Sequence, residues 1–583
     1  TAYEIIAGDW SSDVCSSDLA GTLTLGSANT MAGLTLQHGV VSASADNQLG
    51  AGTAGIIFNN AADALAYGAG GIPVLRITSS FSTPRVLTAS TAGAIEVTSG
   101  NTLTMTGAAA TGTLNKLGAG TIALTVTNGS ATAWNVNAGV LAVSNSAGAA
   151  PLGTNSTTTL NGGTIRITNT GAADYATGNT GTLNINGGGV LALNNTTAFS
   201  TQFTFGSIAR TGQGTMVIAP TASLGGTTGS RARLIATNLL GVVVASSNFA
   251  GIISPTIVRL ADAAPNQDAD FVTYNTTNGF ITGTPTTSAA SLTGSQPGSV
   301  GAIVAAQSLS GVNSIYAFKT NANVSGGTLQ VVSNNTTTQL GGILMNGAGA
   351  AAPVISSNLF FGLVNNNVSQ LNGINCGEGV VYTSTDFTGG TLPTLSGSVT
   401  ANNFTKFGPG TLLFSGTNRI SGSLAVQSGA VQFSGASAQP ASINLTLNDA
   451  GSLDLNGGSV EVAALAGSAG VVTNTSATAG TLLLLGRNDT TFTGTIQDGA
   501  GSVRVIKGGS ATLTQLQQLG ELWIDFHGPG EPQKLMRADT QLEMLDLHAG
   551  LAAVLATYRT GWRLRNDLLR EAGEAATAER LSE

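Results

Sequence analysis

Short alternating runs of apolar and small polar residues recur along most of the chain. Residues 406–433 read KFGPGTLLFSGTNRISGSLAVQSGAVQF, and residues 116–144 read KLGAGTIALTVTNGSATAWNVNAGVLAVS. Valine, isoleucine or leucine alternates with threonine, serine or asparagine, which predicts strands with one buried face and one face in water. Glycine or Asn-Gly bounds each run, and these residues accept the positive φ angles that tight corners require.

The same phrase returns from about residue 20 to residue 514. A partial copy, GTLTLGSANTMAGLTLQHGVVSAS, occupies 21–44, and a last copy begins with KGGSATLT at 507–514. A period of roughly twenty residues with very short strands predicts an all-β fold, a right-handed parallel β-helix or β-solenoid with one phrase per coil. The inward residues of successive coils would then form one continuous core. An array of β-sandwiches is less favoured, because it needs longer strands and buried aromatic anchors.

Charge is scarce in this region and balanced. Residues 20–514 carry 14 basic and 14 acidic side chains, so the net charge of −8 comes entirely from the two ends of the chain. Equivalent positions of neighbouring coils lie about 4.8 Å apart, where like charges repel, whereas asparagine and threonine form hydrogen-bonded ladders. A neutral body lacks the basic face that nucleic acids require, and no apolar run reaches the length of a membrane-spanning helix.

The phrase at 406–433 resembles the autotransporter-associated β-strand repeat. The pattern of that family runs Lys-x-Gly-x-Gly-Thr-Leu-x-Leu-x-Gly-x-Asn and continues to a corner and a second strand. The matching positions are Lys406, Gly408, Gly410, Thr411, Leu412, Gly416, Asn418 and Gly422, while Ile420 replaces the usual tyrosine. The resemblance implies an exported passenger of the outer-membrane surface of a Gram-negative bacterium, acting as an adhesin or a stalk. No alternating strands of the outer-membrane barrel type follow the repeats, so the anchor is not identified.

The first 19 residues do not share the repeat pattern. Reverse translation of GDWSSDVCSSDL at 8–19, with one codon for each residue, resembles a common short-read sequencing adapter, and TAYEI at 1–5 fits the same reagent upstream. We therefore interpret residues 1–19 as a translated adapter. On this interpretation the true N-terminus and any export signal are missing, and a coil edge near residue 20 is uncapped. We expect either a monomer or edge-to-edge self-association through that edge.

The last 69 residues, 515–583, also break the pattern, and they carry 18 of the 50 charged residues. Their apolar residues recur at helical spacing, which predicts a short α-helical tail; these residues are Leu542, Leu545, Ala549, Ala552, Leu555 and Ala556. Because the change falls in the middle of a repeat phrase, we interpret the tail as foreign sequence from a misassembly or a frameshift. The alternative is a native helical cap on the solenoid.

Few side chains suggest chemistry. His38 is the only histidine of the repeat region and has no evident catalytic partner, so we expect a solvent-facing side chain. The densest acidic cluster is Asp262, Asp268 and Asp270; its spacing fits no calcium loop, and we expect a solvated loop between coils. Cys376 has no metal-binding spacing and is expected to be a small buried residue or an exposed bystander.

Two weaker patterns complete the search for a site. Asp525, His527 and His548 are dispersed across the tail and are expected to be surface residues, and the glycines of GAGG at 68–71 lack the strand–loop–helix context of a phosphate loop. The sequence therefore predicts no catalytic residue, no cofactor site and no metal site.

Three functions remain as hypotheses. The leading one is a non-enzymatic, secreted or surface-exposed β-solenoid that binds glycans or host or environmental surfaces, or serves as a stalk. The second is a polysaccharide-acting enzyme, which would need several carboxylates converging in one groove. The third is an ice- or surface-binding face, which would need one flat face of aligned threonines over many coils.

Overall fold

A computed structural model describes residues 21–508 with internal gaps at 53, 60–70, 110, 129–130, 145–149, 196–197, 227–228, 241, 244–250, 262–266, 284–287, 290, 333–339, 348, 363–375, 436–442, 468 and 487–488. The chain divides into two units, Thr1–Gly508 and Gly509–Glu583. The interpretations of residues 1–19 as an adapter and of 515–583 as a helical tail fall outside the described residues.

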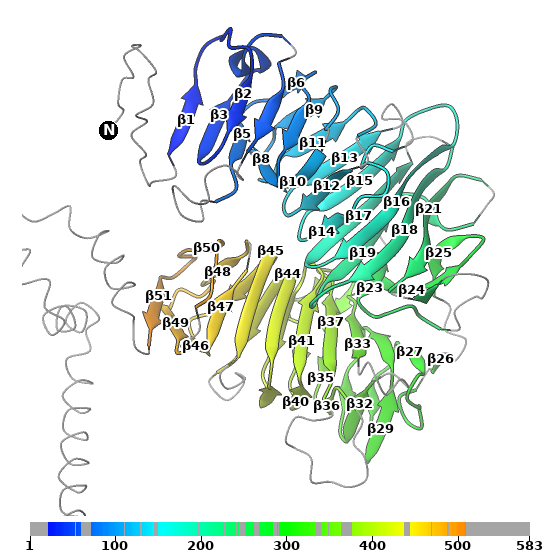
Figure 1. Ribbon diagram of the computed structural model, residues 1–583. Helices are drawn as coiled ribbons and strands as arrows, with labels where there is room; N and C mark the ends of the chain where they lie inside the picture. Colours follow the sequence, from blue (N-terminus) through cyan, green and yellow to red (C-terminus); the bar gives the residue numbers. More distant parts are fainter. Residues whose placement is uncertain are drawn as a thin grey trace, which may run out of the picture. The chain divides into compact units, whose positions relative to one another are not determined.

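The first half of the described chain forms a stack of coils with three sheets (Figure 1). One sheet contains, in spatial order, β1 (Thr22–Leu25), β3 (Val40–Ala43), β5 (Val74–Ile77), β8 (Ala92–Val97), β10 (Thr111–Leu117), β12 (Ala131–Val136), β14 (Thr158–Leu160), β16 (Tyr175–Ile185), β18 (Thr201–Arg210), β21 (Arg231–Leu239) and β20 (Ser223–Leu224), with β22 (Val242–Val243) beside β21. The second contains β6 (Phe81–Thr83), β9 (Thr102–Met105), β11 (Thr121–Leu124), β13 (Val140–Ser144), β15 (Thr164–Asn169), β17 (Gly188–Asn195), β19 (Thr215–Pro220), β23 (Ile257–Leu260), β24 (Ala269–Asn275) and β25 (Gly279–Thr282). The third contains β2 (Leu34–Leu36), β4 (Ile56–Phe58) and β7 (Leu87–Ala89). We call the coils built from β1 to β21 the first stack.

The second half forms another stack, which we call the second stack and which runs from β26 to β51. Its largest sheet contains β26 (Ser288–Ala289), β27 (Val300–Ile303), β30 (Ala317–Thr320), β33 (Leu340–Met345), β37 (Glu378–Thr383), β41 (Asn403–Phe407), β44 (Ser423–Phe433), β42 (Thr411–Phe414), β39 (Thr394–Leu395), β35 (Val354–Ile355), β31 (Val324–Ser325) and β28 (Gln307–Ser308), extended by β45 (Asn444–Asp454), β47 (Ala464–Ala466), β48 (Val471–Thr473) and β50 (Thr495–Ile496). Smaller sheets contain β29 (Val312–Ile315), β32 (Thr328–Val331), β36 (Asn358–Phe360), β40 (Val399–Ala401) and β43 (Asn418–Ile420); β34 (Ala350–Ala351) and β38 (Phe387–Thr388); and β46 (Ser459–Val462), β49 (Gly480–Leu484) and β51 (Val503–Lys507).

The prediction of an all-β parallel solenoid is confirmed. Within each stack the strands of successive coils pair in parallel, as β11 pairs with both β9 and β13. The described residues contain no α-helix, and their one helical turn is a 3₁₀ turn at Asp46–Leu49.

The register of these strands follows from the alternation in the sequence. One inward row, aligned across β9 to β19, consists of Leu103, Ile122, Leu141, Ile165, Leu191 and Ile218, all buried. The neighbouring outward row consists of Thr102, Thr121, Val140, Thr164, Val190 and Val217. Each inward side chain thus packs on its counterpart one coil away, and the outward row mixes threonine with valine instead of forming an unbroken threonine ladder.

The core is not continuous, contrary to the sequence-based expectation. One apolar cluster runs from Leu36 to Phe280 and a second from Leu292 to Leu482. Coil stacking stops between them because β23, β24 and β25 pair antiparallel, with an Asn-Gly corner at Gly279 in the left-handed region. Antiparallel strands can be joined by such a tight turn, whereas stacked coils require parallel strands.

A third apolar cluster joins the two stacks. Outward residues of the second stack, including Leu344, Val380 and Phe407, pack against Val258 of β23 and Phe271 of β24. The neighbouring inward residues belong to the core of the second stack, so this part of the sheet is buried on both faces. That double burial explains the near-continuous apolar runs GGILM and GVVYT in β33 and β37, where strict alternation is lost.

Candidate functional site

The lysine of the repeat phrase is a buried structural residue. Lys406 stands at the end of β41, and its ammonium donates to the carbonyl oxygens of Gly408 at 2.6 Å, Gly410, and Ser428 at 2.8 Å. The first two acceptors belong to the Gly-x-Gly corner of the same coil, and the third belongs to the next coil. The side chain, which is 0% exposed, therefore ties two successive corners together.

The same arrangement occurs in the first stack. Lys116 donates to the carbonyls of Leu117 at 2.8 Å, Gly118 at 2.6 Å and Ala138 at 3.1 Å. Gly139 and Gly429, each in the next coil, have positive φ and lie directly over the lysine, where a Cβ atom would overlap the ammonium or its carbonyl partners. We call this arrangement the lysine staple. It explains why the coil that follows each buried lysine carries a glycine over the ammonium, Gly139 or Gly429.

Burial and hydrogen bonding change the pKa of the Lys406 ammonium in opposite directions. Burial lowers the pKa of Lys406 well below its ordinary value, because removing a charge from water is unfavourable. The three carbonyl acceptors oppose this effect, since an ammonium has three N–H donors to satisfy them and a neutral amine has two.

A variant of the same corner connects the two stacks. Arg210-Thr-Gly-Gln213-Gly occupies the position of Lys-x-Gly-x-Gly at the end of β18. Arg210 reaches across to β37 and forms a bidentate ion pair with Glu378, with N–O distances of 2.8 and 2.6 Å. Gln213 donates to the carbonyl of Phe404 at 3.0 Å and to the hydroxyl of Thr405 at 2.9 Å. We call these contacts the Arg210 clamp.

Glycine allows the two stacks to approach at a second point. β17 contacts β44 and β45, and a Cβ atom on Gly188 would lie 2.7 Å from both the Cβ atom and the carbonyl oxygen of Gln427. A larger residue at position 188 would therefore separate the strands.

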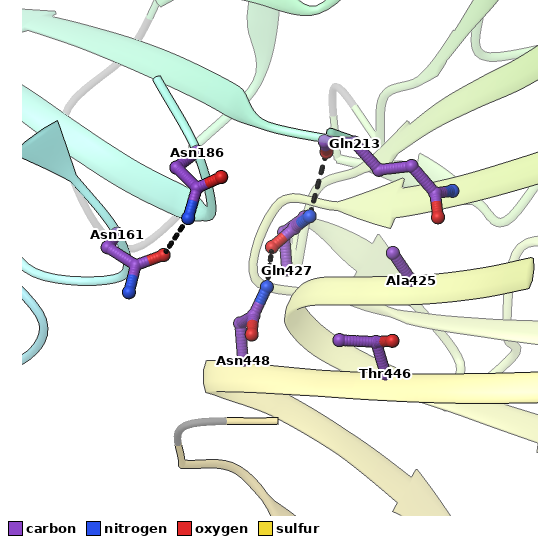
Figure 2. A pocket seen from close by; sticks show the side chains of 7 residues that line it. All are labelled: Asn161, Asn186, Gln213, Ala425, Gln427, Thr446 and Asn448. Carbon is purple, nitrogen blue, oxygen red and sulfur yellow. Dashed lines mark hydrogen bonds between the residues drawn. The ribbon is translucent and has the colours of Figure 1, made fainter. Parts of the chain in front are cut away.

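A polar pocket of about 230 Å³ lies beside this contact (Figure 2). One wall consists of corner residues from three successive coils of the first stack: Asn161 after β14, Asn186 after β16 and Gln213 after β18. The other wall consists of outward residues of β44 and β45 and is formed by Ala425, Gln427, Thr446 and Asn448. None of the seven lining side chains is charged.

The pocket amides are held in place by hydrogen bonds. Asn186 donates to Asn161 at 3.0 Å, which donates in turn to Asn137 at 3.0 Å, so these corners form an asparagine ladder. On the opposite wall, Asn448 donates to the Gln427 side chain at 2.6 Å, and Gln427 donates to the Gln213 carbonyl at 2.7 Å. Figure 2 shows the Asn186–Asn161 bond on one wall of the pocket and the Asn448–Gln427–Gln213 bonds on the other.

The expectations for His38 and Cys376 are met only in part. His38 is half-buried, and both of its ring nitrogens lie out of contact with solvent, so the expected solvent-facing side chain is wrong. Cys376 is intermediate in exposure and pairs with Gly362 in an isolated β-bridge. Burial raises the pKa of its thiol, which favours the unreactive protonated form.

The acidic cluster is not a solvated loop as far as it is described. Asp268 is 7% exposed and accepts a hydrogen bond from the Gly347 amide at 3.0 Å. Asp270 lies in β24 and pairs with Arg259 and Lys319. These carboxylates attach the β24 hairpin to the second stack, a tertiary role that local spacing does not reveal. Asp262, Gly68 and Gly70 lie outside the described residues, as do Asp525, His527 and His548.

Asp454 is a carboxylate held by four hydrogen bonds. It accepts from Gln432 and the Thr475 hydroxyl, both at 2.6 Å, and from the amides of Thr475 and Asn456 at 2.9 and 3.0 Å. Burial alone would raise the pKa of Asp454, but these hydrogen bonds outweigh burial and hold it below its ordinary value. The carboxylate thus joins three successive coils.

We predict an acid-dependent loss of stability that depends on Asp454. Because its folded pKa lies below 3.8, the contribution of this group is complete above its unfolded pKa and is lost as the pH falls through the folded value. Asp454→Asn should lower the unfolding free energy by about 1–2 kcal/mol at pH 7 and flatten its dependence below pH 4. Denaturant unfolding between pH 2 and 7 measures both effects.

The exposed Asp498, which accepts one hydrogen bond from the Val503 amide, provides the control. Asp498→Asn should leave the acid dependence nearly unchanged. Equal effects of the two substitutions would contradict the role assigned to Asp454.

The described residues contain no group of three or more histidine, cysteine, aspartate or glutamate side chains placed to hold a metal ion. Within the same residues, no helix has the length and apolar character needed to cross a bilayer.

Comparison with known proteins adds one partial similarity. No family model matches the chain, and no solved structure matches it. The DNA repair protein RecN of Vibrio cholerae serotype O1 is 39% identical over 72 residues, which cover 12% of this chain and 13% of that protein. The chain thus spans about one eighth of the length of this curated relative, which does not establish membership of its family.

Proposed function

We propose that the chain is a non-enzymatic, surface-exposed or secreted β-solenoid, a segment of an autotransporter-like passenger that acts as an adhesin or a structural stalk. The observation that carries the proposal is the role of three charged groups that are buried or half-buried. The ammonium of Lys406, the guanidinium of Arg210 and the carboxylate of Asp454 each bind partners in neighbouring coils or in the other stack. Their hydrogen bonds hold neighbouring coils, and the two stacks, together.

Arg85 illustrates the same use of a charged group. It is 0% exposed, pairs with Asp46 at 2.9 Å, and donates to the carbonyls of Ala54 at 3.0 Å and Gly50 at 2.8 Å. A guanidinium satisfied on several sides by fixed acceptors fastens a loop and is poorly placed to take part in a reaction. This supports a scaffold function for the first coils.

The resemblance of 406–433 to the autotransporter-associated repeat supports a location outside the cell, with glycans or host or environmental surfaces as partners. The polysaccharide-acting enzyme remains the alternative, and the mixed threonine and valine row of β9 to β19 makes ice binding the weaker of the remaining candidates. We do not extend the DNA-repair role of RecN to this chain, because the similarity covers 12% of it.

A combined retention and cleavage assay tests the proposal. The full chain is incubated with surfaces coated with neutral and acidic polysaccharides, and bound protein and released reducing ends are measured over time. We expect retention on at least one surface with no increase in reducing ends. A steady, protein-dependent release of reducing ends would contradict the proposal and favour the enzyme.

A further inference from the structure

The pocket between β44, β45 and the corners of the first stack has the chemistry of a binding site for an uncharged polyhydroxyl molecule. Five of its seven lining side chains are primary amides, one is a hydroxyl and one is a methyl group. Each amide offers two N–H donors and a carbonyl with two lone pairs, so it can donate to one hydroxyl and accept from the next.

Several of these polar groups remain available to a ligand. Thr446 and Asn448 lie two residues apart on β45, on the same face of the strand. Within the described part of the chain, neither the Thr446 hydroxyl nor the Asn448 carbonyl has a hydrogen-bond partner. Asn186 is exposed at the opposite wall; it donates one N–H group to Asn161 and accepts from the Thr211 hydroxyl at 2.9 Å, which leaves its second N–H group for a ligand.

The other amides hold the walls in place. The Gln213 side chain donates twice to β41 and accepts from Ser423, and Gln427, which is 2% exposed, is held by Gln213 and Asn448. A ligand entering the pocket would not need to order these side chains, which lowers the entropic cost of binding.

We infer that this pocket binds one unit of a neutral saccharide. The absence of charge from the lining disfavours ionic ligands, and the single methyl group of Ala425 is too little apolar surface for a lipid or an aromatic molecule. The volume of about 230 Å³ holds roughly eight waters at about 30 Å³ each, which is the scale of one sugar ring. The inference rests on the adhesive function proposed above and specifies its ligand class.

Saturation-transfer NMR on the full chain tests the inference. The probes are the methyl glycosides of glucose, galactose and mannose, with glucuronic acid and N-acetylneuraminic acid as charged comparators. We expect at least one neutral probe to bind with a dissociation constant on the order of 1 mM and the charged sugars to bind at least tenfold more weakly. No saturation transfer to any neutral probe, or equal binding of the charged sugars, overturns the inference.

Three variants locate the binding. Thr446→Val keeps the shape of the side chain and removes its hydroxyl, and it should weaken binding at least fivefold. Ala425→Leu fills the pocket and should abolish binding. Gln37→Ala removes an exposed amide that lies between β2 and β3, and it should bind like the unmodified chain. Unchanged binding by Thr446→Val and Ala425→Leu overturns the assignment to this pocket.

The two proposals fail separately. If the unmodified chain and Ala425→Leu adhere equally well to polysaccharide surfaces, the pocket is not the adhesive site and the proposed function stands. If the neutral probes bind in the pocket but the chain is retained on no surface, the pocket stands and the adhesive function does not.

Discussion

Replacing Lys406 by methionine is expected to lower the free energy of unfolding of the second stack by about 2–4 kcal/mol. Methionine fills a similar volume but donates no hydrogen bond. The Gly410 carbonyl also accepts from the Ala430 amide. Without the ammonium, the carbonyls of buried Gly408 and of half-buried Ser428 each lose a hydrogen bond.

Hydrogen exchange locates the effect of this substitution. The amides of β41, β42 and β44 should exchange faster in Lys406→Met, whereas those of β11 in the first stack should be unchanged, because solenoid stability is a sum of neighbour interactions. Denaturant unfolding measures the accompanying change in free energy.

Lys507, the first residue of the last repeat phrase, provides a matched control for Lys406. Lys507 binds the carbonyls of Gly486 at 2.7 Å and Gly508 at 2.8 Å but is exposed. Water can replace its ammonium, so Lys507→Met should change stability by less than about 0.5 kcal/mol. If Lys406→Met proves as stable as the unmodified chain, the staple is not a stabilising element.

Replacing Arg210 by methionine is expected to weaken the contact between the two stacks by about 2–4 kcal/mol. The loss has two parts: the bidentate pair itself, and the Glu378 carboxylate left 13% exposed without its partner. Adding Glu378→Met should restore part of the stability, because the uncompensated charge is then removed. Unfolding of the two single variants and the double variant, analysed as a double-mutant cycle, measures the coupling.

The pair Arg76–Glu96 provides the comparison for this clamp. It joins adjacent strands of one stack through a single 2.9 Å contact, and its side chains are 35% and 28% exposed. Arg76→Met should therefore cost less than about 1 kcal/mol. Equal losses for Arg76→Met and Arg210→Met would show that the clamp adds nothing beyond an ordinary surface pair.

The coils were predictable because their determinants are local. In 406–433, alternation and glycine spacing locate the end of β41 and the whole of β42, β43 and β44, and the repetition of the phrase implies the parallel stacking of these strands. Two further signals are visible in the sequence. The Asn-Gly pair that ends at Gly279 indicates a hairpin, and the unbroken apolar run in β33 indicates a strand buried on both faces.

The junction could not be predicted in the same way. Arg210 and Glu378 are 168 positions apart, and no periodic pattern specifies which outward residues a second stack will cover. The sequence shows that Arg210-x-Gly-Gln213-Gly is equivalent to the lysine motif. It does not show that Arg210 pairs with Glu378 of β37. The pocket depends on the same long-range placement, because Asn186 and Asn448 come from different stacks.

The lysine staple also affects the register in which successive coils pair during folding. Successive side chains of a strand point to opposite faces, so a slip of one residue in the pairing of β41 with β44 would turn Lys406 away from the Ser428 carbonyl. A wrongly aligned coil would leave a charged group without its acceptors, while a correct one satisfies it at once. Each staple therefore favours the native register of the coil that follows it. This matters in a protein whose repeats are similar enough to pair in the wrong register.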